Sequence, residues 1–591
     1  MDVSANPWKV QFGEVSVDLQ TGELCRSRRA KPIFLAEQPL QVLQMLLKLP
    51  GEMVSRDELI RALWPGGGFG DFDHGLNKVM NRLRDLLGDS ADSPKFIQTV
   101  ARRGYRFIAP VTTGRATPVV AMAANIPSLA VLPLFNATGD PETEYLSDGI
   151  SESVINLLSQ LPNLRVIPRT SAFRYREREV DLKAVGRDLN VRAVLTGKLI
   201  RRGDRLVVQT ELVDVANDAQ LWGGQVSRKL EDVFEVQEEV ARQISENLRL
   251  RLTPEDEKRL TKRSTQNREA YRFLLKAQYH TNKITPEGYQ RGMDYARQAI
   301  EADPGYADAY VWVAAVYSGL GVSGFLRPAE AFPKAKAAVL KALEVDDSLA
   351  EAHTFLAAVR LFYDWDWSGA EHACKRAIEL NPNYAAIHNV WGDWLFVMGR
   401  QEEAMAESQL GVELDPLSAS LNFNFGQKLW WSGDYERAIE QLNKALEFDA
   451  DFAWAHVALA QVYACRGMYA ESLATCEKVA TLFRDNPHSR ALRSLILAMA
   501  GKTEEAKAIL AELNDRPKLD PMALIRSAES WSVLGDKDKA FQFLEAAYQD
   551  RVSVLIYLGV RPTFNNIRSD LRFTDLLRRM ALPHVPLPHA G

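Results

Sequence analysis

The sequence predicts a multidomain chain in which α+β and α/β segments are followed by an all-α solenoid. Three observations lead to this prediction: a repeated helix-ending phrase in the C-terminal half, alternating strand and helix signals over residues 126–252, and short strands mixed with three helical patterns over residues 1–110. At 591 residues the chain is long enough for about three or four domains.

The C-terminal half repeats one phrase at the ends of five predicted helices. It reads AIEADP, ALEVDD, AIELNP, GVELDP and ALEFDA, and these end at residues 304, 347, 382, 416 and 450. The successive steps are 43, 35, 34 and 34 residues, and Gly399, Gly433 and Gly467 recur inside the units. Small residues let antiparallel helices approach, and an Asn/Asp-Pro pair ends one helix before the next begins. A 34-residue period is that of tetratricopeptide (TPR) repeats, so residues 269–550 should form a solenoid of about eight helix pairs.

A solenoid of this kind has a groove that usually grips a peptide or another protein. We expect the first helix of each pair to line that groove. The predicted partner-binding side chains are Asn389, Asp393, Phe423, Gln427, Trp430, Trp454 and Gln461. The alternative is that some of them, the tryptophans above all, pack between helices. Residues 551–591 should form a C-terminal tail or cap.

Residues 72–88 form a helical pattern with two distinct faces. At about 100° per residue, Leu76, Met80, Leu83 and Leu87 fall within about 60° of one another and form a core face. The opposite side carries His74, Asn77, Lys78 and Asn81, with Arg82 and Arg84 on its flanks. Residues 74–110 contain seven Lys/Arg and three Asp/Glu, a net charge of +4, although the whole chain carries −5. Taken alone, such a polar side is most often just a solvated helix face.

The surrounding residues give that helix a context. Ser55 followed by Glu58 is a capping box at the start of the preceding helix. The helical patterns are preceded by predicted strands in WKVQFGEVSVDLQTGEL and followed by a predicted hairpin in KFIQTVARRGYRFIAPV. The whole of residues 8–110 resembles the winged-helix DNA-binding domain of the OmpR family, including its ToxR- and CadC-like members. The resemblance implies that the polar side of the third helix enters the major groove of double-stranded DNA.

Six residues of that helix, and two at the tip of the closing hairpin, are therefore candidate DNA contacts. They are His74, Asn77, Lys78, Asn81, Arg82, Arg84, Arg102 and Arg103. The hairpin arginines are expected at phosphates or in the minor groove, whereas the alternating Tyr105 and Phe107 should pack in the core.

The glycine-rich loop PGGGFGDFDH before the third helix is interpreted as a flexible connector rather than a phosphate-binding loop. The equivalent loop in the OmpR family touches RNA polymerase, so the resemblance implies RNA polymerase as a further partner. It leaves open whether copies assemble as an oligomer on DNA. Because only about eight residues precede the first strand, we expect control independent of phosphotransfer.

Residues 126–252 follow a weakly patterned linker at residues 111–125. The segments SLAVLPLFN and LSDGISESVINLLSQLPNLRVI, with a predicted hairpin at Gly203-Asp204, resemble the TolB-like amino-terminal fold. That resemblance implies an α/β domain that binds a ligand or a protein, with no reaction. A nucleotide cyclase would instead need metal-holding carboxylates. The candidates Asp140, Glu142, Glu144 and Asp148 more often form a solvated loop and helix N-terminus.

The composition of the chain excludes several classes of protein. Hydrophobic residues make up 46% and charged residues 25%, as in ordinary folded proteins, and the four cysteines form no CxxC pair. Pro127 and Pro133 interrupt the apolar stretch at residues 117–135, so we expect no membrane span, and the N-terminus does not read as a signal peptide. The prediction is a cytoplasmic DNA-binding transcriptional regulator with no cofactor, metal or enzymatic activity. The alternatives are a TPR scaffold whose winged helix serves protein contacts, and a cyclase-like enzyme.

Overall fold

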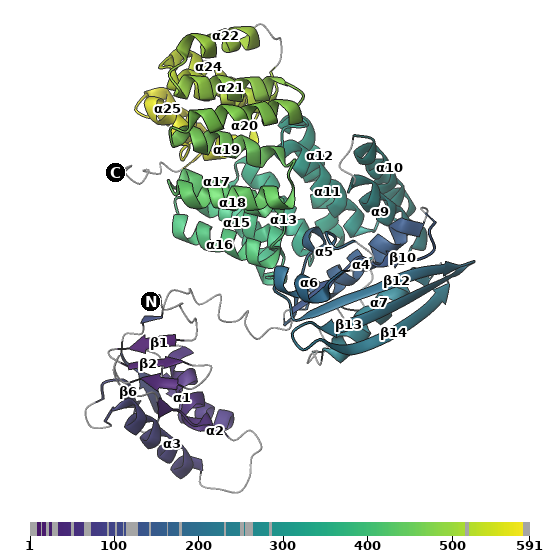
Figure 1. Cartoon of the computed structure of the whole chain (residues 1–591), viewed down its shortest axis with the longest axis vertical. Coiled ribbons are helices and arrows are strands. Elements are labelled where there is room, and N and C mark those ends of the chain that lie inside the picture. Colours follow the sequence, from purple (N-terminus) through teal and green to yellow (C-terminus); the bar gives the residue numbers. More distant parts are fainter. Residues whose placement is uncertain are drawn as a thin grey trace. The chain divides into compact units, whose positions relative to one another are not determined.

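A computed structural model of the chain describes residues 9–12, 15–18, 23–25, 33–48, 53–63, 72–90, 94–100, 103–109, 112–113, 128–140, 143–161, 163–176, 180–229, 232–248, 253, 260, 264–282, 286–514 and 519–582. The chain divides into two compact units, Met1–Asn125 and Ile126–Gly591. Figure 1 shows the elements of each unit. No helix within the described ranges has both the length and the apolar content needed to cross a bilayer.

In the described part of the N-terminal unit, three helices pack against two small antiparallel sheets. One sheet has the order β4 (Ile33–Phe34), β3 (Glu23–Cys25), β2 (Val15–Asp18), β1 (Lys9–Phe12) and β8 (Thr112–Thr113). The other has the order β5 (Met53–Ser55), β7 (Gly104–Phe107) and β6 (Ile97–Val100). The helices are α1 (Glu37–Lys48), α2 (Arg56–Leu63) and α3 (Phe72–Leu87). Because β8 pairs with β1, residues 112–113 belong to this unit's sheet rather than to the predicted linker.

Two local predictions for this unit are confirmed. The Ser55 backbone N–H donates to a Glu58 carboxylate oxygen at 2.8 Å, and the Glu58 N–H donates to Ser55 Oγ at 3.3 Å, which is the reciprocal pattern of a capping box. Tyr105 and Phe107 are buried in the core of the unit.

Gly104 lies where β7 pairs closely with β5. A Cβ atom added there would lie 2.1 Å from the backbone oxygen of Val54, and neither strand can retreat without breaking the pairing with Ser55. We therefore expect Gly104→Ala to destabilise the N-terminal unit by about 3 kcal/mol. Gly88→Ala is the matched control, because its added Cβ meets nothing and only its φ of +73° opposes the substitution, at a cost of about 1 kcal/mol. Hydrogen exchange of the β6–β7 amides measures both losses, and equal losses would contradict the steric explanation.

The second unit begins with a mixed sheet. Its strand order is β11 (Arg165–Val166), β9 (Ser128–Val131), β12 (Ala193–Arg202), β13 (Arg205–Asp214) and β14 (Ala219–Lys229), and β10 (Phe135–Asn136) also pairs with β12. β9 runs parallel to β11 and β12, whereas β12, β13 and β14 form an antiparallel meander. Gly203, with a φ of +64°, starts the turn between β12 and β13, which confirms the predicted hairpin. α7 (Val233–Asn247) packs on the meander and α4 (Glu144–Ser159) packs on α7; α5 (Arg169–Ala172) and α6 (Leu182–Asp188) complete this part.

The described residues between 268 and 549 form a stack of eight helix pairs, as the 34-residue period predicts. The pairs are α9 (Arg268–Thr281) with α10 (Pro286–Ala302), α11 (Ala307–Val322) with α12 (Pro328–Val345), α13 (Ala350–Val359) with α14 (Trp367–Leu380), α15 (Ala385–Val397) with α16 (Gln401–Leu414), α17 (Ala419–Trp431) with α18 (Tyr435–Phe448), α19 (Ala453–Cys465) with α20 (Tyr469–Leu482), α21 (Pro487–Met499) with α22 (Thr503–Asn514), and α23 (Pro521–Val533) with α24 (Lys537–Gln549).

Glycines close the turn inside each of the last five pairs. Gly399, Gly433, Gly467, Gly501 and Gly535 stand 34 residues apart and all have φ between +74° and +85°. This left-handed conformation ends the first helix of a pair and suits glycine because it has no Cβ. The sequence therefore predicts the repeat correctly, because each turn glycine is a local signal that recurs at a fixed spacing.

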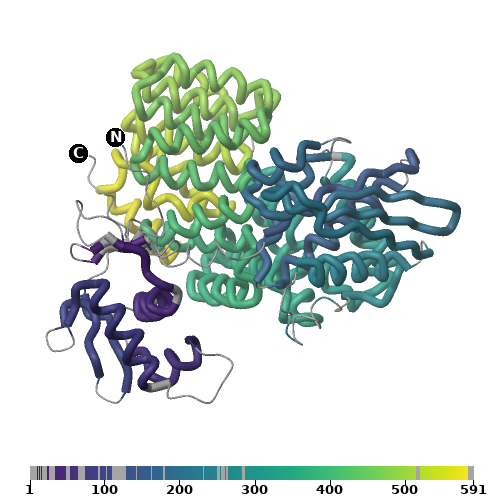
Figure 2. Tube along the Cα trace, turned by 60° about the horizontal axis from the view of Figure 1, so that its bottom comes forward, coloured from purple at the N-terminus to yellow at the C-terminus, as the bar shows by residue number. Residues whose placement is uncertain are grey.

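Residues 551–582 do not form a separate tail. Three short helices, η5 (Ser553–Tyr557), η6 (Pro562–Ile567) and α25 (Leu571–Arg579), fold back onto earlier pairs, and Figure 2 shows the yellow C-terminal residues running beside the green ones. Ser553 Oγ donates to the Gly321 carbonyl at 3.2 Å, and Trp367 Nε1 donates to the Met580 carbonyl at 2.9 Å. The C-terminal segment is thus part of the array's own core.

Candidate nucleic-acid interface

Helix α3 lies with one side in the core and the other in solvent. Leu76, Met80, Leu83 and Leu87 are at most 2% exposed, as their spacing predicts. The side chains of the opposite surface are exposed: His74, Asn77, Lys78, Asn81 and Arg82. No other described residue forms a hydrogen bond or ion pair with the side chains of Lys78, Asn81 or Arg82. At Lys78, Asn81 and Arg82 the helix therefore presents a polar, basic surface to solvent.

Asn77 has a second role that the helical pattern did not reveal. The side-chain oxygen of Asn77, Oδ1, accepts hydrogen bonds from Arg56 Nη2 at 3.0 Å and from the Tyr105 hydroxyl at 3.2 Å. Arg56 Nη1 also donates to the Tyr105 hydroxyl at 2.9 Å. These three side chains connect α3 to α2 and to β7. Asn77 therefore holds the helix in place, and its carbonyl is already engaged.

The structure corrects the expectation for Arg84. Arg84 is only 5% exposed, and its Nη2 donates to the Ile97 carbonyl at 2.9 Å and to Thr99 Oγ1 at 2.8 Å. Arg84 lies only about 40° around the helix from the buried Met80. Strand β6 covers that flank, so the guanidinium supports the hairpin from within and does not reach toward a phosphate.

The hairpin between β6 and β7 ends at an exposed Arg103. The Arg103 backbone N–H donates to the Val100 carbonyl at 3.0 Å, and its own carbonyl accepts from the Arg56 N–H at 3.1 Å. The turn is thereby fixed to the start of α2 with the Arg103 side chain outward. Arg102 lies outside the described residues, as do residues 65–71 of the glycine-rich loop.

The predicted groove of the array is largely occupied by the chain itself. Asp393 and Lys428 are both buried and form an ion pair of 2.6 Å, and Gln461 accepts from Arg526 Nη1 at 2.6 Å. Trp430 is 1% exposed. The prediction that Asp393, Trp430 and Gln461 line an open partner-binding groove is therefore wrong. α23 and the C-terminal segment cover the first helices of these pairs. The part-exposed members of the set are Asn389, Phe423, Gln427 and Trp454.

The acidic residues near α4 are engaged by arginines. Arg176 pairs with Asp148 at 2.7 Å and with Glu144 at 3.1 Å, and Arg201 lies 3.7 Å from Asp140. Glu142 lies outside the described residues. Among the residues that the structure describes, no group of three His, Cys, Asp or Glu side chains is placed to hold a metal ion.

A buried carboxyl joins the middle domain to the array. Ser171 of α5 donates to Asp415, and the Leu417 N–H donates back to Ser171 Oγ at 2.8 Å. Burial raises the pKa of Asp415 to about 6, although the Ser171 hydrogen bond opposes the rise. An unfolded aspartate has a pKa of about 4. The contribution of Asp415 to stability is thus fully present below about pH 4, declines up to about pH 6 and is constant above.

We therefore expect Asp415→Asn to stabilise the second unit at neutral pH by up to about 3 kcal/mol. The gain over wild type should grow between pH 4 and pH 6, because asparagine cannot ionise. Urea unfolding at a series of pH values measures it. A gain that does not change with pH would contradict the assignment of the effect to ionisation.

Comparisons with known proteins divide the chain in the same way. Residues 30–107 match the family "Transcriptional regulatory protein, C terminal", residues 124–243 match "HilA/YgeH-like transcriptional regulator, second domain", and residues 432–467 match "TPR repeat". The N-terminal domain is therefore an OmpR/PhoB-type winged helix, followed by a HilA-like second domain and TPR repeats. The TolB resemblance of the middle domain stays a prediction.

Three curated relatives are similar over parts of the chain. A putative adenylate cyclase 3 of Rhizobium meliloti is 37% identical over 184 residues, which is 31% of this chain and 31% of that protein. The transcriptional regulator HilA of Salmonella typhimurium is 26% identical over 395 residues, 65% of this chain and 66% of HilA. The cholera toxin transcriptional activator of Vibrio cholerae is 37% identical over 81 residues, 14% of this chain and 28% of that protein. The chain thus spans less than two thirds of each relative.

Proposed function

We propose that the protein is a transcription regulator that binds promoter DNA through the exposed side of α3. The observation that carries this proposal is the pairing of a matched OmpR/PhoB-type domain with an outward side bearing Lys78, Asn81 and Arg82. The major groove admits an α-helix, asparagine can bind adenine through two hydrogen bonds, and basic side chains bind phosphates. Because its target is a promoter, the protein is proposed to act in the cytoplasm.

Each residue of the interface has a distinct proposed role. Asn81 reads base edges, and His74 lies about two turns earlier on the same side of the helix. Lys78 and Arg82 contact phosphates, and Arg103 approaches the backbone or minor groove next to the hairpin. Asn77 keeps α3 at the correct angle through Arg56 and Tyr105.

Further partners belong to the proposal. Contact with RNA polymerase and assembly of more than one copy on DNA are part of this proposal, and the names of two relatives, a transcriptional regulator and a transcriptional activator, support only the role in transcription. The TPR array supports a protein partner as well. Because much of the groove is covered, we assign the contact with this protein partner to four part-exposed residues, Asn389, Phe423, Gln427 and Trp454.

Nucleotide cyclisation is favoured only by the partial similarity to a putative adenylate cyclase. The acidic candidates argue against it, because Asp148 and Glu144 share Arg176 and so lack the open carboxylate pair that would hold metal ions. A regulator without enzymatic activity is the better-supported function.

Selection of genomic fragments by the intact protein tests this function. We expect a limited set of recurrent sites that lie upstream of genes and share a sequence motif. Recovery of fragments at random, with no shared motif, would leave the scaffold alternative standing. A metal-dependent turnover assay with ATP should show no cyclic product above background.

A further inference from the structure

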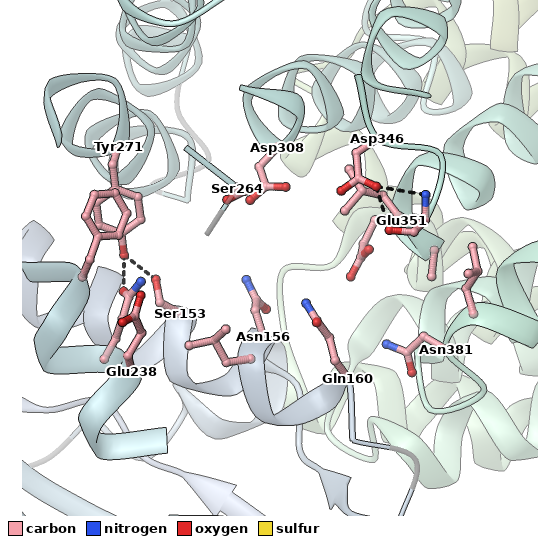
Figure 3. Close-up of a pocket in the computed structure, with 17 residues that line it drawn as sticks. Ser153, Asn156, Gln160, Glu238, Ser264, Tyr271, Asp308, Asp346, Glu351 and Asn381 are labelled. Carbon is pink, nitrogen blue, oxygen red and sulfur yellow. Dashed lines mark hydrogen bonds between the residues drawn. The ribbon is translucent and has the colours of Figure 1, made fainter. Parts of the chain in front are cut away.

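Helix α7 covers one face of the β12–β14 meander. It packs on the buried side chains of that inner face, which are Leu199, Leu206, Val208 and Val226. α7 is also held from behind, because the Tyr271 hydroxyl of α9 donates to Gln237 of α7 and lies 2.6 Å from Ser153 Oγ of α4 (Figure 3). The opposite, outer face of the meander is therefore the one that a partner can reach.

Two arginines face each other at the end of this outer face. Side chains alternate between the faces of a strand, so Lys198, Arg202 and Arg205 lie outward, next to buried residues of the inner face. Arg202 stands directly opposite Arg205 in the register of β12 with β13, and Lys229 continues the row on β14. Like charges directly opposite each other destabilise a sheet. The stability of the fold does not explain this row.

The arginines of the inner face at the same strand ends have acidic partners. Arg201 lies 3.7 Å from Asp140, and Arg228 lies 3.2 Å from Glu235. The outer face differs: three exposed cations there form no ion pair with any residue that the structure describes. We call these three the basic surface of the meander: Lys198, Arg202 and Arg205.

The basic surface is extended rather than convergent. Lys198 and Arg202 are four residues apart, about 13 Å along β12. Acidic side chains are few nearby: Asp204 lies in the turn, and Glu211 is six residues from Arg205, about 20 Å along β13. A single small anion needs donors that converge on one point. Separated cations on an open face instead match a polyanion such as duplex DNA, which carries one charge per about 1.7 Å of its axis.

We propose that the basic surface contacts the phosphate backbone of duplex DNA beside the site that α3 binds. This inference rests on the proposed promoter binding. Fourteen residues separate Thr113 from Ser128, and a chain of that length reaches at most about 50 Å. A protein held on DNA by α3 therefore keeps the meander at a high effective concentration near the flanking duplex. The contact adds affinity without reading sequence.

Fluorescence anisotropy of the intact protein with two duplexes tests this contact. One duplex carries only the selected site, and the other adds about 25 unrelated base pairs on each side. Arg202→Ala combined with Arg205→Ala should bind the short duplex as wild type does. On the long duplex its slope of log affinity against log salt should be lower by about 2, because each phosphate contact contributes about 0.9. Its deficit relative to wild type should therefore shrink about tenfold between 50 mM and 200 mM salt.

Three controls separate this contact from other causes. Arg202→Lys combined with Arg205→Lys should retain the wild-type slope, because it keeps both charges. Arg272→Ala combined with Arg291→Ala removes the same charge from exposed positions of α9 and α10 and should change binding to neither duplex. The alanine variant of the basic surface should melt at the same or a higher temperature than wild type, because it removes two facing like charges.

The outcomes distinguish this inference from the proposed function. No binding of wild type to either duplex would overturn promoter binding and this inference with it. Binding of both duplexes with no loss in the alanine variant of the basic surface would overturn this inference alone. An equal loss in the variant of α9 and α10 would do the same, because it would trace the effect to net charge.

Discussion

Glu529→Ala is expected to destabilise the TPR array by about 3–5 kcal/mol. The Glu529 carboxylate is fully buried and is shared by Arg526 at 2.5 Å and Arg561 at 2.8 Å, with the Thr563 hydroxyl donating at 2.9 Å. Desolvation alone would raise the pKa of Glu529, but the two guanidinium groups outweigh it and lower the pKa. Removal of the carboxylate leaves two arginines buried without their counter-charge. Glu529 lies in α23 and Arg561 directly precedes η6, so the substitution also removes the ion pair between them, and only the hydrogen bonds of Ser532 with Thr563 and Asn566 then join these two elements.

The denaturant midpoint of the array's unfolding transition measures this loss. Glu545→Ala is the matched control, because Glu545 pairs with Arg579 at a partly exposed site and such pairs contribute about 1 kcal/mol or less. A similar, small loss in both variants would contradict the view that Glu529 holds the C-terminal segment against the array.

Lys78→Ala combined with Asn81→Ala is expected to weaken binding to a selected DNA site by about 100-fold or more. Asn81 is proposed to read a base, and one bidentate contact discriminates by about 1–3 kcal/mol. Lys78 is proposed to contact a phosphate, so its loss should weaken binding to all sequences and reduce the slope of log affinity against log salt by about 1. Fluorescence anisotropy at several salt concentrations with the intact protein measures both quantities.

The two single variants separate the roles. Asn81→Ala should reduce the preference for the selected site over unrelated DNA, whereas Lys78→Ala should leave that preference nearly intact. Lys444→Ala, which removes a surface lysine of α18 paired with Glu440, is the control and should change neither property. An Asn81→Ala protein that keeps full sequence preference would count against the assignment of base reading to this residue.

The sequence predicted those features that depend on neighbours along the chain. The turn glycines, the Ser55–Glu58 capping box and the core side of α3 each depend on residues a few helical turns apart at most, and the 34-residue period is the recurrence of such local signals along the chain. They are therefore visible as spacing. The outward side of α3 follows from the same geometry, because four leucine and methionine positions fix which side is buried.

The features that were missed arise from contacts between distant segments. The fate of Arg84 depended on strand β6, which covers the flank of α3, and helical spacing alone places that residue at the border between core and solvent. The groove prediction failed because residues 551–582 fold back onto earlier helices of the array. Contacts such as that between Ser553 and Gly321 hold this segment there, and they join residues that are far apart in sequence.

Site-specific photo-crosslinking from position 81 of the intact protein to a selected duplex tests the role of α3 most directly. The photoreactive side chain should crosslink to bases at one or two adjacent positions of the site, in the major groove. The same group at position 444 should give no crosslink to DNA. Absence of a crosslink from position 81, on DNA that the protein demonstrably binds, would show that another surface contacts the duplex.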